Sequence, residues 1–143
     1  MRIGNFRRQR ALVAGALAAL LCTGCGGGKL SAKALSQQAK TLQSVAAEGA
    51  LLGQNAGFGK TTRTYAREQA SDLYKAASQD ESALRTAKTA PALEPKLRRL
   101  NTLADDASAA LKRLGDASKD EQRRLARKLL AVAEQTKQIG DGL

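Results

Sequence analysis

The sequence predicts an all-α protein, a small up-down helical bundle of about four helices that ends in an antiparallel helical hairpin. Two observations carry this prediction. After residue 30, apolar residues recur three or four places apart in four successive runs, as on one face of an α-helix. Glycines or prolines stand between most of these runs, and Ser118 opens a helix-capping sequence before the last of them.

The first helix is expected over residues 31–53, with Ser31 as its N-cap. Its apolar stripe alternates large and small residues at a 4-3-4-3-4 spacing: Leu35, Ala39, Leu42, Ala46, Gly49 and Gly53. Val45 and Leu52 widen this stripe. The small residues would let a partner helix approach closely.

Residues 53–59 contain three glycines, which predict a turn between helices. The segment runs into Lys60-Thr61 and so invites comparison with a phosphate-binding loop. That motif has four residues between its first glycine and Gly-Lys-Thr, whereas Gly53 leaves five. No strand is expected before it, so we interpret the segment as a turn and reject a nucleotide site.

A second helical region is expected over residues 61–89. One face carries Ala66, Ala70, Leu73, Ala77 and Leu84, which is a thin apolar stripe. The capping sequence from Ser78 to Glu81 leaves open a division into two shorter helices kinked near residues 78–80. Pro91 and Pro95 mark the next boundary, because proline belongs at or before a first helical turn.

The C-terminal hairpin is the clearest element of the sequence. Its first stripe consists of Leu93, Leu97, Leu100, Ala104, Ala107, Leu111 and Leu114, with Gly115 expected as the C-terminal cap. Its second stripe consists of Leu125, Leu129, Val132, Thr136, Ile139 and Leu143, opened by a capping box from Ser118 to Glu121. Only residues 116–118 separate the two helices, which should therefore fold back antiparallel.

The first 25 residues have the features of an export signal. Arginines precede an apolar run over residues 11–21, which is too short to span a bilayer as a helix. The run ends in Leu21-Cys22-Thr23-Gly24-Cys25, which resembles the lipobox of bacterial lipoproteins. Cys22 stands where that family usually has Leu, with Leu21 one place earlier. The resemblance implies cleavage after Gly24, thioether lipidation of Cys25 and acylation of the new amino terminus.

Other interpretations of the two cysteines are weaker. Cys22 and Cys25 have the spacing of a redox pair, but a thioredoxin-like pair follows a strand and opens a helix, whereas this one follows an export signal. A disulfide would need both cysteines in the mature chain, and the expected cleavage removes Cys22. An ordinary leader, cleaved or uncleaved, is the remaining alternative.

Three segments follow from this interpretation: a cleaved signal peptide over residues 1–24, a lipidated Cys25 with a glycine-rich tether over residues 25–30, and a helical domain over residues 31–143. A six-residue tether reaches at most about 20 Å, so the domain should lie close to the lipid. The expected location is extracytoplasmic. It would be the outer membrane if the host has one, because Gly26 is not the Asp that signals retention in the family, and otherwise the outer face of the cytoplasmic membrane.

The composition of the mature chain argues against several function classes. It contains no His or Trp, and Cys25 is its only Cys. The commonest acid-base side chain and the usual zinc ligands are therefore missing, and Asp105-Asp106 and Asp80-Glu81 are adjacent, which points their carboxylates apart on a helix. We expect no enzyme, no cofactor and no metal site. Three aromatic residues (Phe58, Tyr65 and Tyr74) are too few for a nucleic-acid stacking platform.

The remaining charge pattern leaves two hypotheses. The mature chain has 20 basic and 13 acidic residues, a net charge of +7 spread without a long basic block. The leading hypothesis is a tethered, non-catalytic interaction or structural module that binds an envelope protein or another copy of itself. The alternative is electrostatic binding to an anionic envelope polymer or lipid headgroups, with no specific nucleic acid expected. Its candidate contacts are Arg98, Arg99, Lys112, Arg113, Arg123, Arg124, Arg127 and Lys128.

Overall fold

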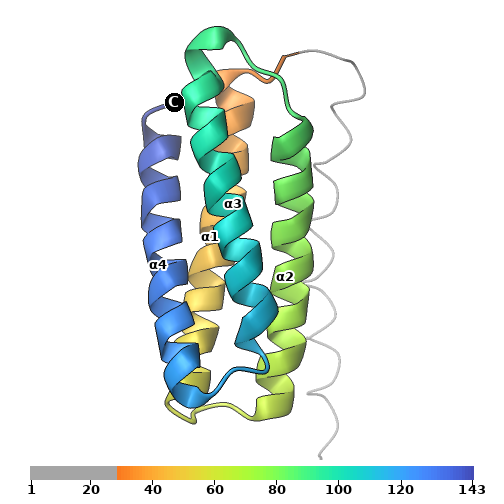
Figure 1. Cartoon of the computed structure of the whole chain (residues 1–143). Helices are drawn as coiled ribbons and strands as arrows, with labels where there is room; N and C mark the ends of the chain where they lie inside the picture. The colour runs from red at the N-terminus through yellow and green to blue at the C-terminus, as the bar shows by residue number, and fades with distance from the viewer. Residues whose placement is uncertain (1–28) are drawn as a thin grey trace, which may run out of the picture.

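The computed structural model describes residues 29–143, so the leader, Cys25 and the three glycines of the tether lie outside the described part. Four α-helices follow one another: α1 (Ala32–Gly57), α2 (Arg63–Thr86), α3 (Glu94–Leu114) and α4 (Lys119–Asp141). A single 3-10 turn, η2 (Pro91–Leu93), precedes α3. The helices run alternately down and up the molecule (Figure 1).

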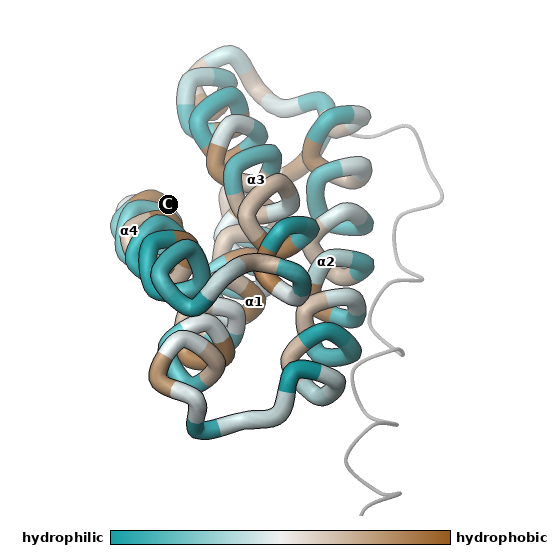
Figure 2. Tube along the Cα trace, turned by 60° about the horizontal axis from the view of Figure 1, so that its bottom comes forward, coloured by the Kyte–Doolittle hydropathy of each residue, from teal (hydrophilic) through white to brown (hydrophobic). Residues whose placement is uncertain are grey.

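The four helices surround one interior, as the view toward the lower end shows (Figure 2). Each helix packs against two neighbours, so that the order around the bundle is α1, α2, α3, α4 and back to α1. The tightest pair is α1 with α4, followed by α2 with α3. The predicted all-α bundle and its C-terminal antiparallel hairpin are confirmed.

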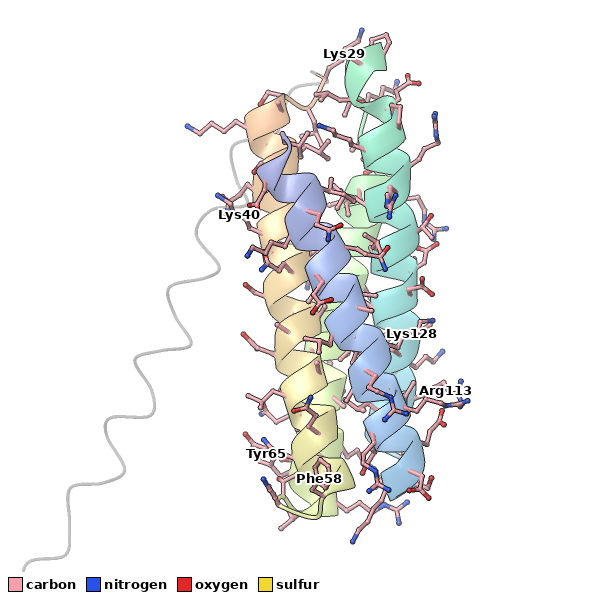
Figure 3. The ribbon with its side chains drawn as sticks, turned by 90° about the vertical axis from the view of Figure 1, so that its left-hand side faces the viewer. Lys29, Lys40, Phe58, Tyr65, Arg113 and Lys128 are labelled. Atoms are coloured by element: carbon pink, nitrogen blue, oxygen red, sulfur yellow. The ribbon has the colours of Figure 1, made fainter. Side chains whose placement is uncertain are left out.

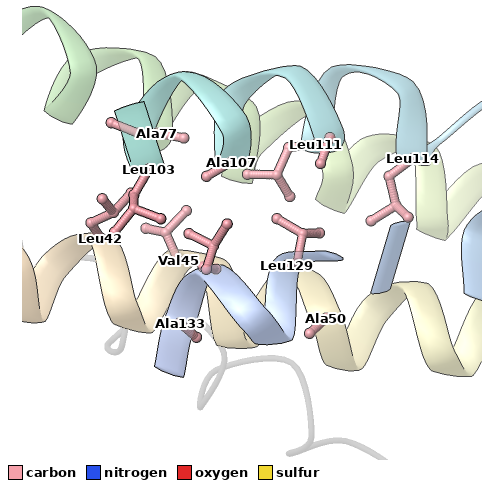
Figure 4. Close-up of a cluster of buried hydrophobic side chains, with 14 of the residues drawn as sticks. Leu42, Val45, Ala50, Ala77, Leu103, Ala107, Leu111, Leu114, Leu129 and Ala133 are labelled. Carbon is pink, nitrogen blue, oxygen red and sulfur yellow. The ribbon is translucent and has the colours of Figure 1, made fainter. Parts of the chain in front are cut away.

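The interior is built from the stripes that the sequence predicts. Leu42 of α1, Leu111 of α3 and Leu129 of α4 are fully or almost fully buried and point into the same cluster (Figure 4). All six stripe positions of α1 are buried, whereas α2 buries only Ala66, Ala70, Ala77 and Leu84. Leu73, Leu93, Ile139 and Leu143, also expected in the stripes, are half-buried at the edge of the core.

The turn predicted over residues 53–59 is largely wrong. Helix α1 continues to Gly57, and only Gly59 adopts a left-handed backbone, with φ of 69°. Gly49, Gly53 and Gly57 lie on the α1 face that packs against α4, and a Cβ atom at Gly53 would lie 3.0 Å from the Ala126 Cβ. These glycines thus permit close approach of two helices, as the small residues of the predicted stripe indicated for Gly49 and Gly53. Only the assignment of Gly53 and Gly57 to a chain reversal is wrong.

Two further expectations are resolved in α2 and α3. Helix α2 is continuous from Arg63 to Thr86, so Ser78 does not start a new helix. Gly115 follows the last turn of α3 as expected, but its φ of −66° is right-handed. A Cβ atom there would lie 2.8 Å from the Arg67 Cα, so the need for glycine comes from the contact with α2.

The two predicted N-caps Ser31 and Ser118 are confirmed, and Thr62, which was not predicted, caps α2 in the same way. Ser31, Thr62 and Ser118 each accept a hydrogen bond from the backbone N–H three residues ahead. No helix among residues 29–143 is both long enough and apolar enough to cross a membrane.

Candidate functional site

The two ends of the bundle differ in what they carry. The chain enters at the end where α1 begins, and its C-terminus lies at the same end (Figure 1). There the Leu30 N–H donates to the Lys88 carbonyl oxygen at 2.6 Å, which pins the start of the described chain to the α2–α3 connection. We name this the tether end. The opposite end holds the α1–α2 and α3–α4 turns, and we name it the far end.

An exposed apolar surface lies beside the α1–α2 turn at the far end. Four large apolar side chains are conspicuously exposed in the described chain: Leu51, Phe58, Tyr65 and Leu130. Three of them lie at or near this turn, Leu51 in the last turns of α1, Phe58 at its C-cap and Tyr65 in the first turn of α2. Figure 3 shows Phe58 and Tyr65 together at this end. We define the turn patch as Leu51, Phe58, Lys60 and Tyr65.

Phe58 is held beside two cations although 65% of it is exposed. The guanidinium carbon of Arg123 lies 5.6 Å from the ring centroid and the Lys60 Nζ lies 6.0 Å from it. Arg123 also donates to the Gly57 carbonyl oxygen at 2.7 Å and pairs with Asp120. The ring is therefore positioned by α4 through cation–π attraction and is not buried by it.

A groove of about 390 Å³ runs along α1 and α2 beside the patch. Its apolar lining consists of Leu51, Leu52, Tyr65 and Leu73. Its polar lining consists of Glu48, Asn55, Lys60, Thr61 and Gln69. A second hollow, of about 580 Å³, lies between the two turns of the far end and includes Arg63 and Lys119. Thr61 lines both hollows, so they adjoin.

The basic residues predicted as anionic contacts do not form one free basic surface. Arg113 and Arg124 share Glu121 at 2.8 and 2.5 Å, and this pairing lowers the pKa of the Glu121 carboxyl. Lys128 pairs with Asp106 at 2.7 Å and Arg98 with Glu94 at 3.7 Å. Arg99 donates to the Gln135 amide oxygen. Among the described residues, Lys112 and Arg127 are the two of the eight without an ion pair or side-chain hydrogen bond, and both are exposed.

One carboxyl group has a perturbed environment on α2. Burial raises the pKa of Asp80 from its usual 3.8 to about 6, and one of its oxygens is buried without a hydrogen-bond partner in the described chain. Within residues 29–143, no three His, Cys, Asp or Glu side chains gather as a metal site would need. Asp80 thus stands alone, and we treat it as a stability determinant.

The sequence interpretation missed the turn patch. Leu51 and Tyr65 lie off the apolar stripes of their helices, and Phe58 follows the last residue of α1. The available signal was that two of the mature chain's three aromatic residues flank one turn.

Comparisons with known proteins give no assignment. No protein-family model matches this sequence, and neither the curated proteins nor the solved structures contain a match.

Proposed function

We propose that this protein is a lipid-anchored, extracytoplasmic helical bundle that acts as a non-catalytic interaction module of the cell envelope. The observation that carries the proposal is the sequence Leu21 to Cys25, which closes an export signal and is followed within four residues by Lys29 at the tether end of the bundle. The lipid on Cys25 would hold the protein at the membrane, and the bundle would present its far end to partners.

The geometry supports an upright arrangement. Three residues, Gly26 to Gly28, separate Cys25 from Lys29, and these four steps along the chain allow at most about 14 Å between the lipid and the bundle. Helix α1 has 26 residues and is about 39 Å long at 1.5 Å per residue. The turn patch lies at the other end of this helix, so a bundle that stands on its tether would hold the patch well outside the headgroup layer.

Most of the eight candidate basic residues already form ion pairs within the bundle, which favours the interaction role over the electrostatic alternative. Five of the eight candidate contacts are paired with carboxylates of the same bundle, which reduces the charge that they offer to an anionic polymer. In contrast, the turn patch leaves apolar surface uncovered. Contiguous exposed apolar surface marks sites where proteins or membranes bind, and a polymer without apolar groups would leave it uncovered.

The anchor is tested by replacing each cysteine in the full chain. Cys25→Ala should abolish labelling with radioactive palmitate, leave uncleaved precursor and release the protein from the membrane fraction. Cys22→Ala is the matched control and should be labelled like the wild type. Loss of labelling in the Cys22 variant alone would contradict the assigned cleavage site.

The electrostatic alternative is tested by salt. Lys112→Gln with Arg127→Gln removes the two candidate contacts that have neither an ion pair nor a side-chain hydrogen bond, and so should leave the fold intact. If charge drove envelope binding, this variant would bind anionic polymer more weakly, and the wild type would lose affinity steeply between about 50 and 200 mM salt. Envelope binding that is insensitive to both changes supports the interaction module.

A further inference from the structure

We propose that the turn patch is the docking site of this module, and that its occupant is a protein segment in which a large apolar side chain is flanked by carboxylates. This inference deepens the function proposed above and rests on it. Its observations are the exposed patch, the groove beside it and the cations that surround both.

The apolar part of the patch selects an apolar side chain. Leu51 is 60% exposed and Tyr65 51% exposed, and both line the groove between α1 and α2. Leu52 and Leu73 form its deeper wall. One large apolar side chain bound in this groove would cover apolar surface that the bundle itself leaves exposed to water. Removing apolar surface from water is the main favourable contribution to association.

The charged part selects carboxylates. Lys60, Arg63 and Lys119 lie at the two turns, and none of them has an ion pair within residues 29–143. Residues 57–69 and 112–124, which form this end, hold eight basic and four acidic residues, a net charge of +4. Three of the four acids (Asp116, Asp120 and Glu121) already pair with arginines. The unpaired cations therefore lie next to the groove and would attract acidic flanks.

The same observations disfavour the other occupants. In the proposed arrangement the bilayer adjoins the tether end, and the turn lies about 39 Å away along α1, so an upright bundle would not bring the patch to the bilayer. An anionic polymer without apolar groups would satisfy the cations but leave Leu51 and Tyr65 uncovered. A protein segment supplies both kinds of group.

The first test selects peptide ligands from random sequences. A twelve-residue peptide library displayed on phage is panned against the full lipidated chain reconstituted in neutral vesicles. We expect enriched peptides to carry a Leu, Phe or similar residue flanked by Asp or Glu. The double variant Phe58→Ala with Tyr65→Ala should bind them at least tenfold more weakly, whereas Leu130→Ala, which truncates the exposed leucine outside the patch, should bind them like the wild type.

Charge is tested with a second matched pair. Lys60→Glu with Lys119→Glu should weaken binding at least tenfold, and Lys33→Glu with Lys88→Glu at the tether end should not. Unchanged melting temperatures show that each variant is folded. The proposal is overturned if no peptide is enriched, if the enriched peptides lack acidic residues, or if they bind the patch variants as well as the wild type.

The membrane is tested with a fluorescent reporter. The chain contains no Trp, so Phe58→Trp introduces a single one in the patch. Its emission should be the same in neutral and anionic vesicles and should shift to the blue only when an enriched peptide is added. A blue shift in anionic vesicles alone would assign the patch to the lipid surface and overturn the proposal. Palmitate labelling of Cys25 is measured on the same preparations, so loss of the anchor and loss of the docking site are distinguished.

Discussion

The pair formed by α1 and α4 is packed differently from the pair formed by α2 and α3. Along α1, Gly49, Gly53 and Gly57 face α4, and two of them contact Leu129 and Ala126. Close approach of this kind brings many atoms into van der Waals contact, although each contact is weak. The α1–α4 pair is accordingly the tightest in the bundle.

The α2–α3 pair relies more on polar groups. At its rim, Arg85 of α2 pairs with Asp105 of α3 at 3.0 Å. Arg67 of α2 pairs at 2.5 Å with Asp116, which lies in the turn after α3. Helix α2 buries only four residues, three of them alanines. Three polar atoms of the two helices are buried without hydrogen-bond partners in the described chain, on Asp80, Asn101 and Ser108, compared with two on α1 and α4, on Gln38 and Thr136. Such groups reduce stability, because they lose water and gain no replacement.

The difference in packing between the two helix pairs explains where the bundle leaves apolar surface exposed. Helix α4 covers the glycine face of α1 so closely that little of it remains exposed. Helix α2 has a narrower apolar stripe. Near its start, Leu51 and Tyr65 stay outside the core and Leu73 is only partly covered. The patch at the far end is thus a consequence of the weaker packing of α2 against α1.

The close packing of α1 with α4 predicts that α4 is central to the stability of the bundle. Leu129 is fully buried, whereas its neighbour Leu130 is 42% exposed. Leu129→Ala should lower the free energy of unfolding by about 2–5 kcal/mol, because it leaves a cavity among Leu111 and the α1 glycines. Leu130→Ala is the matched control and should change it far less. Thermal melts followed by circular dichroism measure both, and equal losses would contradict the assigned core.

A bulky residue in the glycine face of α1 should disturb its packing against α4. A Cβ atom at Gly53 would lie 2.9 Å from the Leu114 Cδ1 and 3.0 Å from the Gln122 carbonyl oxygen. Gly53→Val should therefore lower the free energy of unfolding by about 1–3 kcal/mol through overpacking. Gln54→Val places the same side chain on the exposed side of α1 and controls for helix propensity. A Gly53 variant as stable as this control would show that the close approach is unimportant.

Most of the fold could be predicted from the sequence because its stripes are local patterns. Apolar residues recur at helical spacing from Leu97 to Leu114 and from Leu125 to Thr136. Each of these stripes predicts which face of its helix is buried. The partner of each face could not be predicted, since a stripe does not specify which helix covers it. Gly53 and Gly57 were assigned to a turn for this reason, although Gly53 was also placed correctly on the apolar stripe. Their role depends on α4, which lies more than 60 residues away in the sequence.

The candidate site was less predictable than the fold. Pairs such as Arg113 with Glu121 join two helices across a turn, and the charge count alone cannot show that they neutralise each other. The turn patch exists because its large side chains are not buried by the bundle. The sequence indicates this only indirectly, through an aromatic residue that lies off the apolar stripe. Cys25 lies outside the described residues, and its lipidation stays a prediction.

The polar character of α2 gives a pH-dependent prediction. Burial raises the pKa of Asp80 to about 6, so the folded bundle holds this proton more tightly than the unfolded chain does. The stability that Asp80 contributes is fully present below pH 3.8 and is lost as the pH rises to about 6. Asp80→Asn should therefore stabilise the bundle at pH 7, by about 1–2 kcal/mol after allowance for partial solvent exposure.

This gain should disappear as the pH falls to 4, because the wild-type carboxyl is then neutral as well. Urea unfolding at pH 4, 5, 6 and 7 measures the trend. Asp72→Asn is the control. Asp72 is an exposed aspartate of the same helix and pairs with Lys75, so its replacement should show no gain in stability at pH 7. A constant difference between Asp80→Asn and wild type across these pH values would show that burial does not perturb Asp80.

The smallest effect is expected at the rim of the α2–α3 pair. Arg85 reaches both Glu81, at 2.8 Å on its own helix, and Asp105, at 3.0 Å on α3, but its side chain is 64% exposed. Exposed ion pairs contribute little, because water solvates the charges and holding long side chains still costs entropy. Arg85→Gln should thus lower the free energy of unfolding by less than about 1 kcal/mol, and by less still in 1 M salt, where the attraction is screened. A larger loss of unfolding free energy would mean that this ion-pair network is a main force that holds α2 on α3, and a salt-independent loss would mean that the network is shielded from solvent. The two helix pairs would then differ in the kind of interaction that joins them as well as in how closely they pack.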